Sequence, residues 1–168
     1  MKKRSFDKLI TNLEEITKQY RLLLDCVRKE KEFLVQSNID MLNESNNVKD
    51  QILAKIRTIE NQRILSAGEL AGHVGANTEE PRLLEIAQKI GGPEGDRLRT
   101  IHSTLELLVK RLVDINKDNA VYAETALIVV NSAMDNIKES LMGQKTYQKK
   151  GSYQQGYDKS GHLVSKEA

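Results

Sequence analysis

The chain has 168 residues, of which 30% are charged and one is a cysteine, and its formal net charge is +2. One cysteine excludes an intrachain disulfide, and so small a net charge does not indicate a surface for nucleic acid or anionic membrane. Tryptophan is absent and aromatic residues make up 4%, which is typical of long helices with aliphatic seams rather than of a compact mixed core. We therefore expect an all-α protein in a reducing compartment, with Cys26 as a structural thiol.

The first predicted helix spans residues 5–36, with Ser5 as its N-cap. Apolar residues recur there in alternating steps of three and four, interrupted by polar Glu30. This seam consists of Phe6, Leu9, Leu13, Ile16, Tyr20, Leu23, Val27 and Leu34. The basic residues 2–4 are not followed by an apolar run, so we expect neither a signal peptide nor a membrane-spanning segment, and a soluble cytoplasmic protein.

The second predicted helix begins at Ile39, capped by Asn38, and continues to about Leu70. The short polar break between the two helices predicts an antiparallel hairpin. Polar residues interrupt the apolar pattern at the start of this helix, namely Asn43, Asn46 and Asn47. We therefore expect that end to be frayed or solvent-exposed.

A loop is predicted over residues 71–78, and Thr78 is expected to cap a short helix that runs from Pro81 to about Ile90. The glycine-rich run 91–95 then ends that helix. The last predicted helix begins near Asp96 and extends to about Met142.

Two apolar stripes follow this last helix. The first, seam A, alternates steps of three and four in the manner of a coiled coil. It consists of Leu98, Ile101, Leu105, Leu108, Leu112, Ile115, polar Asn119, Tyr122, Ala126, Val129 and Ala133. Asn119, with Asn116 beside it, is expected either to fix the register of packing or to bond the backbone of a bound partner.

The second stripe, seam B, is offset by one residue from the first. It consists of Val113, Asn116, Ala120, Ala123, Leu127, Val130, Met134, Ile137 and Leu141. One coiled-coil seam cannot cover both stripes. Up to Ala126 the two arms of the hairpin could flank the helix; beyond it we expect the face to bind an amphipathic helix of another protein. The candidate anchors are Leu127, Val130, Met134, Ile137 and Leu141.

After Gly143 aliphatic residues almost vanish, so we expect residues 143–168 to be a disordered tail. Residues 1–142 are expected to form a single elongated domain: an antiparallel coiled-coil hairpin, a short helix and a long C-terminal helix.

No catalytic or metal site is expected. His73, His102 and His162 lie on different segments without further ligands at metal-binding spacing. The run 91–95 lacks the Gly-Lys-Ser/Thr ending of a phosphate loop, and no nucleophile–base pair can be assembled. We therefore predict that the chain is not an enzyme and needs no cofactor. The tail lysines, without arginine, do not indicate nucleic-acid binding.

Three segments give the chain a resemblance to the FlgN family of flagellar type III export chaperones. These are the hairpin turn Gln36-Ser37-Asn38-Ile39-Asp40-Met41-Leu42-Asn43, with Lys49-Asp50-Gln51-Ile52-Leu53 and Asn61-Gln62-Arg63 after it; the last helix with Asn116, Asn119 and Asn131 among aliphatics; and Thr146-Tyr147-Gln148-Lys149-Lys150-Gly151.

The resemblance implies a chaperone without ATPase activity. It would bind the C-terminal helical regions of the hook–filament junction proteins FlgK and FlgL, prevent their premature assembly and deliver them to the export gate protein FlhA. In the family the C-terminal helix holds the client, and a tail tyrosine contributes to docking on the gate. That tyrosine corresponds best to Tyr147, although Tyr157 has the same spacing to a following glycine.

A self-associating structural coiled coil is the alternative prediction. In that case seam B would be a homodimer seam, and a weak homo-oligomer would form. Light scattering separates the two, because a stable monomer with an exposed apolar helix favours the chaperone.

Overall fold

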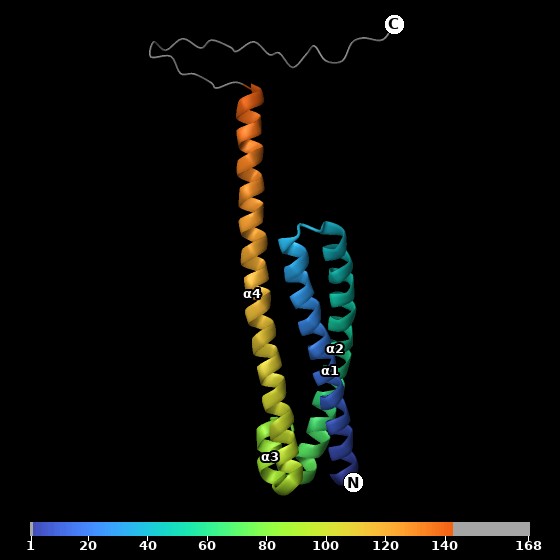
Figure 1. Cartoon of the computed structure of the whole chain (residues 1–168). Coiled ribbons are helices and arrows are strands. Elements are labelled where there is room, and N and C mark those ends of the chain that lie inside the picture. Colours follow the sequence, from blue (N-terminus) through green and yellow to red (C-terminus); the bar gives the residue numbers. More distant parts are fainter. Residues whose placement is uncertain (1, 143–168) are drawn as a thin grey trace, which may run out of the picture. The chain divides into compact units, whose positions relative to one another are not determined.

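In the computed structural model, residues 2–142 are described and form four α-helices (Figure 1). They are α1 (Lys2–Val35), α2 (Ile39–Val74), α3 (Leu83–Ile90) and α4 (Gly92–Met142). The all-α prediction is confirmed. The predicted tail, 143–168, lies outside the described residues. The chain falls into two compact units, Met1–Tyr122 and Ala123–Ala168, so α4 contributes to both.

The helices α1 and α2 form the predicted antiparallel hairpin (Figure 1). The side chain of Asn38 caps α2 as expected, since its Oδ1 accepts a hydrogen bond from the Met41 amide at 3.1 Å. Ser37, with φ 54°, makes the turn between the helices. The Lys49 ammonium pairs with Glu30 at 2.9 Å, so the one polar position in the α1 seam is neutralised across the hairpin.

The predicted N-cap of α1 is wrong. The helix begins at Lys2, and Ser5 is 8% exposed inside it. The neighbouring Phe6, 4% exposed, packs into the core cluster at this end of the hairpin. Burial of the first turns therefore extends the helix beyond the residue that the capping pattern selected.

The predicted end of α2 is also wrong, because the helix continues to Val74. Leu70 and Ala71, both 0% exposed, pack in the core, which favours continued helix. Gly75 ends it in the left-handed conformation, with φ 71° and ψ 32°, which glycine adopts without steric cost.

The connection to α3 uses Asn77 rather than Thr78. Its Oδ1 accepts hydrogen bonds from the amides of Glu79 and Glu80, at 2.9 and 3.1 Å, as in an Asx turn. The short helix begins at Leu83, and its N-cap residue Arg82 makes no side-chain capping bond. The prediction of a Thr78 cap and a start at Pro81 is therefore wrong, although the short helix itself is present.

The last helix begins at Gly92, four residues earlier than expected. Gly91, with φ 64°, ends α3 and is the single residue between the two helices. The rest of the glycine-rich run, residues 92–95, forms the first turn of α4. At Gly95 a side chain would collide with the carbonyl oxygen of Ala87. The glycines thus permit a tight α3–α4 corner rather than a longer loop.

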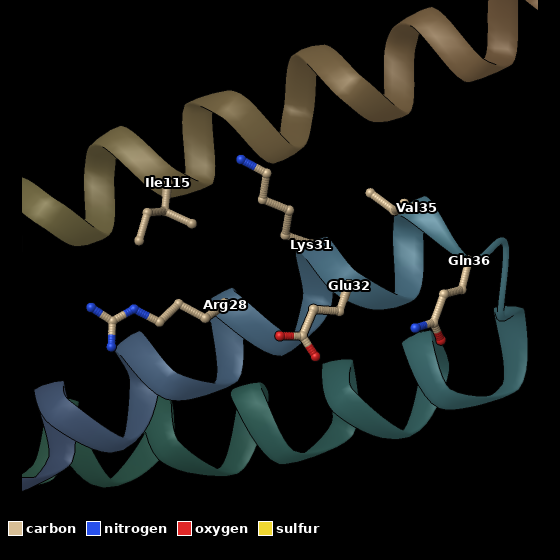
Figure 2. A pocket seen from close by; sticks show the side chains of 6 residues that line it. All are labelled: Arg28, Lys31, Glu32, Val35, Gln36 and Ile115. Atoms are coloured by element: carbon tan, nitrogen blue, oxygen red, sulfur yellow. The ribbon is translucent and has the colours of Figure 1, made fainter.

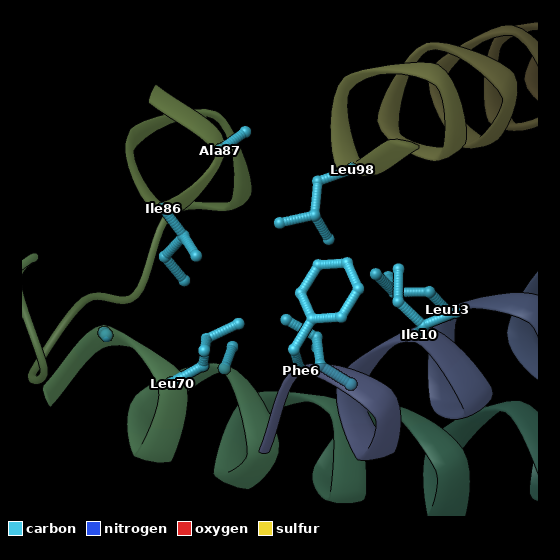
Figure 3. Close-up of a cluster of buried hydrophobic side chains, with 10 residues drawn as sticks. Phe6, Ile10, Leu13, Leu70, Ile86, Ala87 and Leu98 are labelled. Carbon is cyan, nitrogen blue, oxygen red and sulfur yellow. The ribbon is translucent and has the colours of Figure 1, made fainter. Parts of the chain in front are cut away.

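Two clusters make the core of the Met1–Tyr122 unit. The first joins all four helices at the end of the hairpin that holds the N-terminus (Figure 3), and it consists of Phe6, Leu9, Ile10, Leu13, Ala67, Leu70, Ala71, Ile86, Ala87 and Leu98. The second lies further along the hairpin and consists of Ile16, Leu23, Cys26, Val27, Ile52 and Ile56. Leu105, Leu112 and Ile115 of α4 pack against it.

Candidate functional site

From Leu98 to Asn119, seam A of α4 is buried or partly buried against the chain itself, whereas Tyr122 is 40% exposed. Leu98 is 0% exposed and Leu108 9%, while Leu112 and Ile115 are half-buried against the second cluster. The Arg97 guanidinium adds a contact to Glu14 of α1 at 2.6 Å. The first half of the heptad pattern is therefore used for intramolecular packing.

Asn119 is the polar position of this packed seam. It is 2% exposed, and its Nδ2 donates a hydrogen bond to the Val27 carbonyl of α1 at 3.0 Å. Its Oδ1 is buried without a hydrogen-bond partner within the described part of the chain. Asn116 is exposed. This directional bond joins α4 to α1, which is the geometry that the first of the two expected roles, fixing the register of packing, requires.

In residues 123–142 the apolar side chains described by the structure are exposed. Leu127 is 60% exposed, Val130 56%, Met134 51% and Ile137 52%. The side chain of Leu141 and the whole of Tyr147 lie outside what the structure describes. Four of the five candidate anchors are thus accessible in the free protein, and all five lie on α4.

The apolar and polar side chains of this segment gather on different sides of the helix. At about 100° per residue, Leu127, Val130 and Ile137 fall on one side, while Glu124 and Asp135 fall on the other. The Asp135 carboxylate lies 3.7 Å from the Lys138 ammonium. Two residues depart from the pattern: Lys138 lies only about 20° from Leu127, and Ile128, 59% exposed, is apolar but belongs to the polar side by its position. It offers a matched control for the apolar face.

A second surface feature is a hollow of ≈ 450 Å³ beside the C-terminal half of α1, which sequence reasoning did not find (Figure 2). It is lined by Arg28, Lys31, Glu32, Val35, Gln36 and Ile115. Basic, acidic, amide and apolar groups all contribute, so the lining does not define one class of ligand. Periodicity gave no signal for it, because only Ile115 belongs to a seam.

Among residues 2–142, no group of three or more His, Cys, Asp or Glu side chains could hold a metal ion. Burial, followed by the nearby Glu60 carboxylate, raises the pKa of Tyr20, and Arg63 opposes this. Cys26 is buried and its Sγ lies 3.4 Å from the Ser45 carbonyl oxygen, in keeping with a structural thiol. No helix within this part of the chain is long and apolar enough to span a bilayer.

The fold and the exposed face define an all-helical protein of coiled-coil type with an apolar helix surface accessible to other chains. The family model described as FlgN protein matches residues 1–155, and the chain belongs to the FlgN family. This is a family of flagellar export chaperones, which bind hook-associated proteins, and not a family of enzymes. The resemblance found in the sequence is confirmed. Neither the curated proteins nor the solved structures contain a match to the chain.

Proposed function

We propose that this chaperone acts in the cytoplasm, where it binds the C-terminal helical regions of the junction proteins FlgK and FlgL, prevents their premature assembly and delivers them to the export gate. One observation carries the proposal: the apolar face of residues 127–137 is exposed to between 51% and 60% at its four anchors. A client helix with a matching apolar stripe would bury these side chains and its own.

The size of this face suits reversible binding. Full burial of a Leu, Val, Ile or Met side chain contributes roughly 1.5–3 kcal/mol, and about half of that is available here, since each anchor is already partly covered by its own helix. Four anchors and an equal number of client side chains can offset the cost of association and reach a Kd on the order of micromolar or below. An export chaperone must release its client, and such an affinity permits release.

The second part of the proposal concerns the gate. By resemblance to the family, Tyr147 docks on the cytoplasmic domain of FlhA, with Tyr157 as the competing assignment. Both residues follow α4, so one chain can carry a client on its last helix and a gate contact beyond it. Ordering such a segment on binding reduces the net affinity, which favours a transient contact.

The experiment uses the full-length chain with Leu127→Asp and Val130→Asp together, and Ile128→Asp as the control. The double variant places two carboxylates in the buried interface, and we expect its Kd for C-terminal fragments of FlgK or FlgL to rise by more than about a hundredfold. The control carries a new carboxylate of similar exposure on the polar side, and we expect a change of no more than about twofold.

Isothermal titration calorimetry gives both Kd values, and circular dichroism shows whether the helix is intact. Unchanged client binding by the double variant would overturn the proposal. Light scattering of the free chain tests the alternative: a concentration-dependent dimer that the double variant abolishes, without any client binding by the original chain, would instead establish a self-associating coiled coil.

A further inference from the structure

Residues 123–142 carry both seams at once, in contrast to the covered part of α4. Seam A continues there as Ala126, Val129 and Ala133, and seam B as Leu127, Val130, Met134 and Ile137. All seven of these residues are exposed. When seam A is numbered as the a and d positions of the heptad, seam B falls at b and e, so apolar residues occur at a, b, d and e, whereas a single coiled-coil seam needs only a and d.

The covered part of α4 shows how many neighbouring side chains one packing surface shields from solvent. Leu108 is 9% exposed, but its neighbours Leu107 and Val109, which point about 100° to either side, are 51% and 41% exposed. The hairpin therefore buries one seam and leaves the residues beside it in solvent. One surface of this kind cannot cover Leu127 and Val129 together, because they point about 160° apart on either side of Val130.

From this we infer that the client supplies two helices, which pack on adjacent sides of residues 123–142, about 100° apart, one along seam A and the other along seam B. The inference rests on the proposed function and specifies its partner: a helical pair rather than a lone amphipathic helix. Both stripes would then be buried in a three-helix arrangement made by two chains.

The two seams select different client helices. Seam A presents Ala126 and Ala133, so its partner can approach closely and must bring large apolar side chains to fill the space. Seam B presents Leu127, Val130 and Met134, which fill more of the interface themselves, so smaller partner side chains suffice. Since the segment is about 30 Å long, each client helix needs about five turns.

The test places a photo-crosslinking amino acid, benzoylphenylalanine, at position 127, 129 or 128 of the full-length chain. Each version is mixed with a full-length hook–filament junction protein, irradiated, and the linked peptides are mapped by mass spectrometry. We expect positions 127 and 129 to link to two different helical segments of the client, and position 128 to give less than about a tenth of their yield.

Three results would overturn the inference. If positions 127 and 129 link to the same segment, the client presents one helix, and the proposed function stands while the two-helix inference fails. Links from position 129 only to a second copy of the chaperone would assign seam A to a homodimer. If the junction protein is not captured by the unmodified chain, the proposed function fails and this inference with it.

A second measurement uses single substitutions and no crosslinker. Leu127→Asp and Val129→Asp should each weaken binding of the full-length junction protein by about tenfold or more, because each places a carboxylate against a different client helix. An unchanged affinity for Val129→Asp beside a weakened Leu127→Asp would show that seam A stays in solvent, and would contradict the inference.

Discussion

Two regions of α4 have similar apolar patterns and different surroundings. In the Met1–Tyr122 unit, Leu98 is 0% exposed because helices of the same chain pack around it; in the following unit, Leu127 is 60% exposed. The two leucines lie on the same helix, so helix propensity does not distinguish them. An apolar seam predicts that one face of a helix packs against something. Whether it packs within the chain or against another protein depends on which other helices of the chain lie beside it.

The largest predicted effect is the difference in the free energy of unfolding between alanine substitutions of Leu98 and Leu127. We expect Leu98→Ala to lower the free energy of unfolding by about 2–5 kcal/mol, because it leaves a cavity in the first core cluster. Leu127→Ala should change it by no more than about 0.5 kcal/mol, since little packing is lost at an exposed site. Urea unfolding followed by circular dichroism measures both. Equal losses would show that Leu127 is also part of an intramolecular core.

Much of the fold could be predicted, because heptad periodicity over tens of residues is a strong signal and Asn38 is a clear cap. The helix ends could not. Ser5 and Thr78 have the right chemistry for caps, but burial of the residues around Ser5 and the Asx turn at Asn77 override them. The local sequence predicts a loop at Ala71, because it does not show that this residue is 0% exposed within the first core cluster.

The same distinction between an apolar pattern and its surroundings applies to the candidate client-binding face. Leu127, Val130, Met134 and Ile137 are exposed in the structure, whereas periodicity alone also permits an intramolecular partner for this face. Their role in client binding stays a prediction. The bond from Asn119 to Val27 could not be foreseen, because it depends on which carbonyl of α1 lies opposite.

A smaller effect tests the polar position of the covered seam. Asn119→Ala removes the hydrogen bond to the Val27 carbonyl, and we expect a loss of about 1–2 kcal/mol. The matched variant Asn116→Ala, at an exposed position of seam B, should cost less than about 0.5 kcal/mol. Similar values for the two variants in denaturant unfolding would show that the Asn119 contact does not fix the packing of α4 on α1.

The smallest effect concerns Tyr20, which is half-buried in the covered region. Since burial raises its pKa above the ordinary value of 10.0, the folded state favours the neutral phenol. The resulting stabilisation is fully present below pH 10 and is lost as the pH rises through the folded-state pKa. We expect Tyr20→Phe to flatten the decline in stability above pH 10. The same decline in both proteins would show that Tyr20 does not contribute to it.

Hydrogen–deuterium exchange of the full-length chain, alone and with a junction protein, tests most directly whether residues 123–142 are the surface that the client covers. We expect added client to slow amide exchange strongly in 123–142, because burial of both seams suppresses local opening of the helix. Exchange in the core segments of α1 and α2 should change little. Protection confined to residues 2–122, with 123–142 unaffected, would contradict the account.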